Sequence, residues 1–264
     1  MLRGKFLILT APALLAAGCA GAPAGSSDAS LVWSADLARS LPRQSGDVVE
    51  VARFSQLAPS AAILPWEPYL MLRANARTEY RLVEERGDVA LEAQAKEGGS
   101  GLYRKIRIDP TRHPVLEWRW QVPKVAGSDP GVVSRHSPMV RLSLGFHGDL
   151  SKLDFDDRAK LRLAKKLTPQ GLPYASLIYV WMHDVPVGSV IRSPYTDRVR
   201  MIVVESGEQR LGEWVSVRRN VLEDYRRAFG EEPWDIVSVG IMTDVGDDGS
   251  PRRSFYGDIT FRRE

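Results

Sequence analysis

Strict two-residue alternation between apolar and polar side chains is the feature of this sequence that most constrains its fold. The alternation is clearest over residues 115–122. Its apolar set is Leu116, Trp118, Trp120 and Val122, and its polar set is Glu117, Arg119 and Gln121. A period of two places successive side chains on opposite faces of a strand, whereas a helix face repeats about every 3.6 residues. The segment therefore predicts a strand in a half-buried sheet.

Similar segments recur along the chain, with turn residues between them. Residues 78–84 and 89–95 flank Arg86-Gly87-Asp88. Because a glycine can adopt a positive φ there, the two segments predict a hairpin. Further strands are predicted at 102–108, 139–147, 176–183, 199–205, 213–219, 236–244 and 255–262.

Two segments instead favour short helices. The first, 155–167, consists of good helix formers and stops before Pro169. The second, 220–229, begins at Asn220, which can cap a helix, and is followed by Gly230, which can end one. Together, about ten strands and two short helices predict a mainly β fold, a two-sheet antiparallel sandwich of jelly-roll type.

The N-terminal residues have the layout of an export signal. Arg3 and Lys5 precede an apolar run over 6–17, which is shorter than the roughly 20 residues of a transmembrane helix. The run ends in Leu15-Ala16-Ala17-Gly18-Cys19, which resembles a bacterial lipobox and contains the only cysteine of the chain. We therefore expect a signal peptide over 1–18 and acylation of Cys19. The alternative is a soluble secreted protein that is cleaved nearby at an A-x-A-like site.

The predicted organisation after the signal peptide is simple. Residues 19–30 are small and turn-forming and predict a flexible tether, and 31–264 predict a single β-sandwich domain. Removing 1–18 removes two cations, so the formal charge falls from +3 to +1. A near-neutral domain lacks the basic surface that nucleic acid requires, so we expect no nucleic-acid partner. Ala20 after the cysteine, rather than aspartate, favours a lipid anchor in the outer membrane of the cell envelope, with the domain facing the periplasm.

Short motifs along the predicted strands resemble those of the DUF3047 family of uncharacterised bacterial exported proteins. The motifs are Ser100-Gly-Leu102, Trp118-Arg-Trp120, Tyr179-Val-Trp181, Arg219-Asn-Val221 with Asp224-Tyr225, and Asp244 followed by Tyr256-Gly-Asp258-Ile. The resemblance covers roughly 49–261 and implies a β-sandwich similar to carbohydrate-binding modules, without an established reaction. The resemblance also leads us to expect acidic residues where this chain has Arg135-His136-Ser137-Pro138, and an Asp-rich run where it has Val245-Gly-Asp-Asp248. No metal or catalytic role is therefore carried over to those two places.

Several predicted strands carry polar or aromatic residues opposite their aliphatic ones. If these strands are neighbours in one sheet, one open face combines aromatic rings, carboxylates and guanidinium groups, which suits a sugar ligand. The expected ligand-binding residues are Glu117, Arg119, Arg141, Tyr179, Trp181, Asp244 and Asp258. The alternative interpretation is a solvated sheet face, on which cross-strand ion pairs contribute little to stability.

No motif in the sequence specifies a cofactor or a reaction. The histidines at 113, 136, 147 and 183 lack the i, i+4 spacing of a helical zinc motif, so we predict no metal centre. A structural calcium ion is an alternative, with Asp244, Asp247, Asp248 or Asp258 as its ligands. The segment Asp247-Asp248-Gly249 is, however, also typical of an ordinary turn. The sequence contains no G-x-S-x-G elbow and no phosphate-binding glycine loop. Whether the protein is an enzyme therefore stays open.

These observations predict a lipid-anchored envelope protein that binds a glycan or a similar envelope component on one sheet face. Two alternatives remain open. One is a carbohydrate-active enzyme that uses carboxylates of the same face, such as Glu117 and Asp244. The other is an assembly or scaffold protein without a small ligand. The sequence indicates neither the ligand nor the oligomeric state.

Overall fold

The computed structural model describes residues 35–70, 76–124, 137–167, 172–246 and 249–264. The predicted signal peptide and the whole predicted tether, including Cys19, lie outside this part. In chain order the elements are α1 (Ala35–Ser40), β1 (Val48–Ala52), a 3₁₀ helix (Phe54–Gln56), β2 (Glu67–Tyr69), β3 (Glu79–Glu85), β4 (Asp88–Ala95), β5 (Gly99–Ile108), β6 (Val115–Gln121), β7 (Val140–Phe146), a second 3₁₀ helix (Leu150–Lys152), α2 (Phe155–Leu167), β8 (Ala175–Met182), β9 (Val190–Arg192), β10 (Val199–Ser206), β11 (Val215–Asn220), α3 (Val221–Phe229), β12 (Ile236–Asp244) and β13 (Arg252–Arg262).

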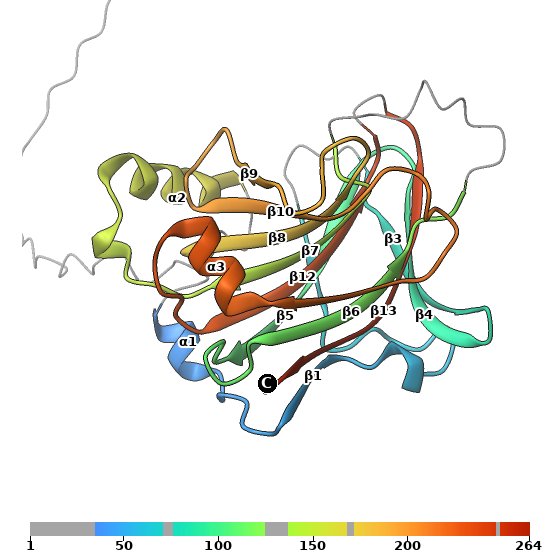
Figure 1. Cartoon of the computed structure of the whole chain (residues 1–264), viewed down its shortest axis with the longest axis horizontal. Coiled ribbons are helices and arrows are strands. Elements are labelled where there is room, and N and C mark those ends of the chain that lie inside the picture. The colour runs from blue at the N-terminus through green and yellow to red at the C-terminus, as the bar shows by residue number, and fades with distance from the viewer. Residues whose placement is uncertain (1–34, 71–75, 125–136, 168–171, 247–248) are drawn as a thin grey trace, which may run out of the picture.

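The strands form two sheets that pack face to face (Figure 1). The six-stranded sheet has the order β11-β6-β13-β4-β3, with β1 also paired to β13. The seven-stranded sheet has the order β2-β5-β12-β7-β8-β10-β9. This arrangement confirms the prediction of a mainly β, two-sheet sandwich.

One strand pair corrects the expectation of purely antiparallel sheets. β10 pairs with β8 in parallel, whereas the other pairings among the described strands are antiparallel. The chain runs from β8 to the outermost strand β9 and then returns as β10 between the two. β10 is therefore antiparallel to β9 and parallel to β8.

Local signals in the sequence account for the ends of several elements. The side chain of Asn220 accepts a hydrogen bond from the backbone N–H of Glu223 at 3.1 Å, and α3 ends at Gly230, which has a φ of 71°. Between β3 and β4, Arg86 and Gly87 both have positive φ, as the type I′ hairpin turn requires. The predicted helices and the hairpin are thus confirmed, whereas the very short elements α1, β1, β2 and β9 were not predicted.

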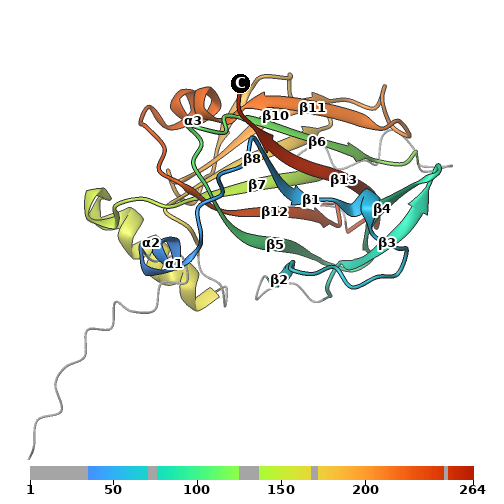
Figure 2. The same cartoon turned by 90° about the horizontal axis from the view of Figure 1, so that it is seen from below.

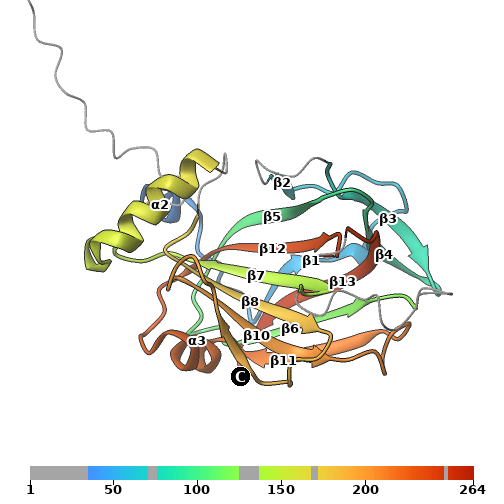
Figure 3. The same ribbon diagram turned by 90° about the horizontal axis from the view of Figure 1, so that it is seen from above.

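The helices lie at one end of the sandwich and the β3–β4 hairpin lies at the other (Figures 2 and 3). The structure contains three α-helices in its described part, where the sequence predicted two. None of the helices in that part has the length and apolar character of a membrane span.

The core fills the space between the two sheets. Leu116, Trp118 and Trp120 of β6 are buried there, as their alternation predicts. The ring centroid of Trp118 lies 5.1 Å from that of Tyr179, which belongs to the other sheet. Aromatic side chains from both sheets therefore interdigitate and hold the sandwich closed.

Candidate functional site

The structure places the seven predicted ligand-binding residues in three separate regions. Arg141 and Asp244 lie on the outer face of the seven-stranded sheet, Glu117, Arg119 and Asp258 lie on the outer face of the six-stranded sheet, and Tyr179 and Trp181 lie in the core. The expectation of one shared face is therefore wrong. Its physical reason is that β6 and β7, which are neighbours among the predicted strands, belong to different sheets.

Tyr179 and Trp181 are core residues of β8 and are inaccessible to a ligand. Both have no exposed surface. The indole N–H of Trp181 donates to the carbonyl of Gly207 at 2.9 Å. Alternation did not reveal their orientation, because the opposite face of β8 carries the apolar residues Ile178 and Val180. Either set could have faced the core.

Tyr179 belongs to a polar cluster around the buried carboxylate of Asp224, which attaches α3 to the sandwich. Its hydroxyl donates to Asp224 at 3.0 Å. Arg219 donates to both carboxylate oxygens of Asp224, at 2.8 and 2.5 Å, and Arg227 donates at 3.2 Å. Burial, together with the neighbouring Asp224 carboxylate, raises the pKa of Tyr179 well above its usual value. The cluster is therefore a structural clamp between β8, β11 and α3.

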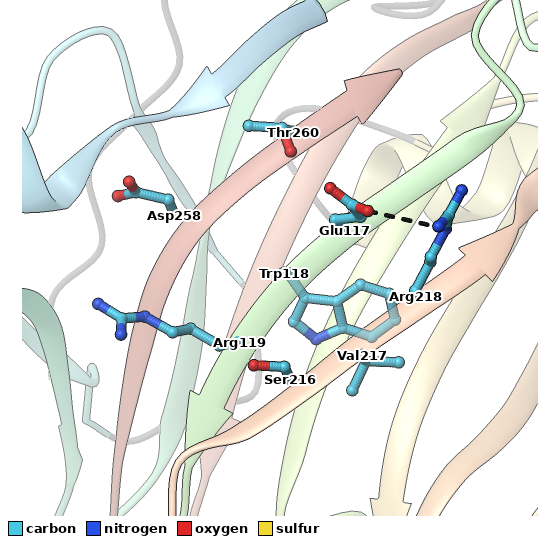
Figure 4. A pocket seen from close by; sticks show the side chains of 8 residues that line it. All are labelled: Glu117, Trp118, Arg119, Ser216, Val217, Arg218, Asp258 and Thr260. Atoms are coloured by element: carbon cyan, nitrogen blue, oxygen red, sulfur yellow. Dashed lines mark ion pairs between the residues drawn. The ribbon is translucent and has the colours of Figure 1, made fainter. Parts of the chain in front are cut away.

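The outer face of the six-stranded sheet carries a shallow pocket of about 310 Å³ (Figure 4). Glu117 from β6 accepts a hydrogen bond from Arg262 at 2.6 Å, and its other oxygen lies 3.7 Å from Arg218 of β11. Asp258 accepts hydrogen bonds from the backbone N–H and the hydroxyl of Ser55, at 2.9 and 2.6 Å. Both carboxylates of this pocket are thus already partnered within the protein.

Arg119 crosses the same face and is also partnered. Its guanidinium pairs with Asp88 and lies 4.7 Å from the ring centroid of Trp214. The side chain passes directly over Gly257, where a Cβ would lie 2.5 Å from Arg119 Cγ. A larger residue at position 257 would therefore displace the Arg119 side chain. The face therefore matches the alternative interpretation, a solvated sheet surface with a cross-strand ion-pair network.

The outer face of the seven-stranded sheet carries a trough whose floor consists of small residues. Strand register places Tyr103, Gly240, Ser143 and Ile178 in one row across β5, β12, β7 and β8. The next row is Lys105, Ser238, Gly145, Ser176 and Val199. Each row has only glycine and serine at its centre, and larger side chains at both ends. The result is a trough of about 200 Å³.

Aromatic and aliphatic side chains form the walls of the trough. Tyr69 and Tyr103 stand on one side with their rings edge to face and the ring centroids 6.2 Å apart. The hydroxyl of Tyr103 donates to Glu67 at 2.8 Å, and burial together with this carboxylate raises the pKa of Tyr103. Leu172 and Pro173 line the trough near Gly145.

An ion pair borders the trough. Arg141 pairs in register with Met242 of β12, so it lies on the same face as Asp244, two residues further along that strand. Arg141 Nη1 lies 2.7 Å from Asp244 Oδ1, and the two side chains are 17% and 24% exposed. The contact lacks hydrogen-bonding geometry, so both atoms remain without a hydrogen bond to the described residues. The pair is thus compensated in charge but incompletely hydrogen-bonded.

The small residues of the floor are required by close packing. A Cβ at Gly145 would overlap the hydroxyl of Ser238, and a Cβ at Gly240 would lie 2.5 Å from the hydroxyl of Ser143. The trough was not predicted from the sequence because glycine and serine side chains carry no distinctive chemistry. The available signal was glycine inside predicted strands, which often marks the close approach of another group.

The structure also bears on the calcium and enzyme alternatives. Asp244 and Asp258 lie on opposite sides of the sandwich, and Asp247 and Asp248 lie outside the described residues. No group of three or more histidine, cysteine or acidic side chains is arranged to hold a metal ion in the described part. Glu117 and Asp244 do not share a face, so the carboxylate pair expected for an enzyme is wrong. Glu117 and Asp258 do line one pocket.

Comparisons with known proteins identify a family and distant structural likenesses. A family model described as "Protein of unknown function (DUF3047)" matches residues 64–260. No curated protein matches the chain.

The chain is similar in structure to several solved proteins. Endoglucanase 3 of family GH12 from Trichoderma harzianum is 7% identical, with a TM-score of 0.38, and the match covers 77% of this chain and 100% of that one. The xyloglucanase domain of NopAA from Sinorhizobium fredii is 7% identical, with a TM-score of 0.39 and the same coverage. The mannan-recognising carbohydrate-binding module TmCBM27 is 11% identical, with a TM-score of 0.33, and the match covers 83% of this chain and 99% of that one.

Proposed function

We propose that this chain, which belongs to the DUF3047 family, binds a saccharide in the trough of the seven-stranded sheet. The observation that carries this proposal is the composition of the trough. A floor of glycine and serine lies between a tyrosine wall and an aliphatic wall, next to the incompletely hydrogen-bonded pair of Arg141 and Asp244.

Each part of the trough matches a part of a sugar ring. Aromatic and aliphatic walls can cover the apolar C–H faces of the ring. The hydroxyls of Ser143, Ser176 and Ser238 can each donate and accept hydrogen bonds to sugar hydroxyls. Arg141 lines the trough, and its guanidinium can donate charge-assisted hydrogen bonds to a sugar hydroxyl. The mixture of mostly apolar walls and few polar groups is typical of small-molecule sites.

A substitution that fills the trough with a larger side chain tests the proposal. Ser176→Phe is expected to weaken binding of an envelope saccharide to the purified full chain by at least about tenfold, equivalent to about 1.4 kcal/mol. The ring would fill space between Gly145 and Val199, which flank Ser176 in register. Isothermal titration calorimetry measures the effect, and Ser176→Leu repeats the test with a smaller side chain.

The matched control is Ser216→Phe, which makes the same change on the outer face of the six-stranded sheet. It is expected to leave the affinity unchanged. The reverse outcome, in which Ser216→Phe abolishes binding and Ser176→Phe does not, would move the site to the other sheet. Turnover of a bound saccharide would instead support the enzyme alternative. Failure of every tested envelope saccharide to bind would favour the scaffold alternative.

We also propose that the protein acts while tethered to the outer membrane through acylated Cys19, facing the periplasm. The support is the lipobox-like sequence before this residue and the length of chain between Cys19 and α1. Since each buried methylene contributes about 0.8 kcal/mol, one acyl chain binds reversibly, but the two or three chains of a lipoprotein hold firmly.

Cys19→Ser is expected to abolish lipid labelling of the full-length chain. Wild-type protein should incorporate a fatty-acid analogue and stay with membranes through a high-salt wash, since acyl insertion is little weakened by screening. The variant should incorporate none, and should be released or remain as an uncleaved precursor. If the wild type takes up no label and washes free in salt, the protein is a soluble secreted one.

A further inference from the structure

This inference rests on the proposed function and concerns the chemical class of the saccharide. Arg141 is the only charged residue among the described residues that line the trough. Asp244 already pairs with it at 2.7 Å. Lys105 lies beside the trough in the same row as Ser238, and its ammonium contacts both carboxylate oxygens of Glu67 at 3.0 Å. Each of these two cations therefore has its own carboxylate.

From this pairing we infer that the trough selects an uncharged saccharide over an acidic one. An anionic group loses its hydration on entering a pocket, and this cost is recovered only if an available cation or several donors meet it. Next to Arg141, a uronate carboxylate would also lie close to Asp244, and the two like charges would repel each other. Next to Lys105 it would meet Glu67 in the same way. Neutral hydroxyl groups meet neither penalty.

The size of the trough indicates how much of the saccharide it holds. Its volume of about 200 Å³ is below the roughly 300–1,000 Å³ of pockets for larger ligands. A single uncharged sugar ring therefore occupies the floor. Because the bound sugar carries no net charge, its affinity should depend little on ionic strength.

Pairs of methyl glycosides that differ only at C6 test this selectivity. Glucose is compared with glucuronate, and galactose with galacturonate, by calorimetry on the full chain at low and high sodium chloride. The neutral member of the best-binding pair is expected to bind at least about tenfold more tightly, with less than about a twofold change in Kd between the two salt concentrations. Equal or tighter binding of the acid would overturn the inference while leaving the proposed function intact. Absence of binding by both members of every pair would overturn both.

Asp244→Asn tests the cause of the selectivity. The amide keeps the shape of the side chain but leaves the charge of Arg141 uncompensated. The variant is therefore expected to bind the acidic glycoside about tenfold more tightly relative to the neutral one than the wild type does. The matched control Asp258→Asn removes a carboxylate from the opposite side of the sandwich and should leave the ratio unchanged. An unchanged ratio in Asp244→Asn, with folding intact by circular dichroism, would contradict the assigned role of the ion pair.

Discussion

Replacing Trp181 with alanine is expected to lower the free energy of unfolding by about 3–5 kcal/mol. The indole has no exposed surface, and its N–H donates to Gly207 at 2.9 Å. The substitution therefore opens a large cavity in the core and leaves the carbonyl of Gly207 without its partner. Urea denaturation followed by circular dichroism measures the change.

Trp234→Ala is the matched control for Trp181→Ala. Trp234 is 49% exposed, and its ring centroid lies 5.0 Å from that of His147. Its removal is expected to cost no more than about 1 kcal/mol, because it deletes little buried surface. If Trp181→Ala were as stable as Trp234→Ala and lost only ligand binding, Trp181 would be a binding residue after all.

The second large effect is expected at Asp224, whose carboxylate holds α3 against the sandwich. Asp224→Asn should destabilise the protein by about 2–4 kcal/mol, which is somewhat less than the roughly 3–5 kcal/mol typical of breaking a fully buried ion pair. The expected loss of stability is smaller because Arg219 and Arg227 are partly exposed and can turn toward solvent after the substitution. Tyr179 has no such freedom and would face an amide in place of a carboxylate.

Asp197→Asn provides the comparison, because its carboxylate also pairs with an arginine, Arg200, but is 74% exposed. Its loss should change the free energy of unfolding by less than about 1 kcal/mol. Equal midpoints of thermal unfolding for Asp224→Asn and Asp197→Asn would contradict the role of Asp224 as a clamp.

The parts of the fold that sequence analysis predicted correctly depend on local patterns. β6 alternates between large apolar and charged side chains, so only one arrangement buries Leu116, Trp118 and Trp120. The cap at Asn220 and the hairpin turn at Arg86 and Gly87 likewise depend on residues adjacent in sequence. Such features require no knowledge of which strands become neighbours.

The site was harder to predict, because it depends on strand pairing between distant parts of the chain. Glu117 and Arg141 both face away from the core, as the alternation in their strands predicts. The sequence, however, contains no local signal that places β6 and β7 in different sheets. The trough exists only because Gly240 and Ser143 fall side by side in register, about a hundred residues apart in sequence. The orientation of Tyr179 was predicted wrongly for a different reason, since both faces of β8 carry large apolar residues.

NMR chemical-shift mapping of the isotope-labelled protein, titrated with the tightest-binding neutral glycoside, tests the location of the site most directly. Saccharide binding in the trough predicts that the largest amide shifts cluster at Gly101, Ser143, Gly145 and Gly240, with Arg119 and Ser216 unaffected. Shifts that cluster at Arg119 and Ser216 on the six-stranded sheet, with the trough glycines unchanged, would contradict it.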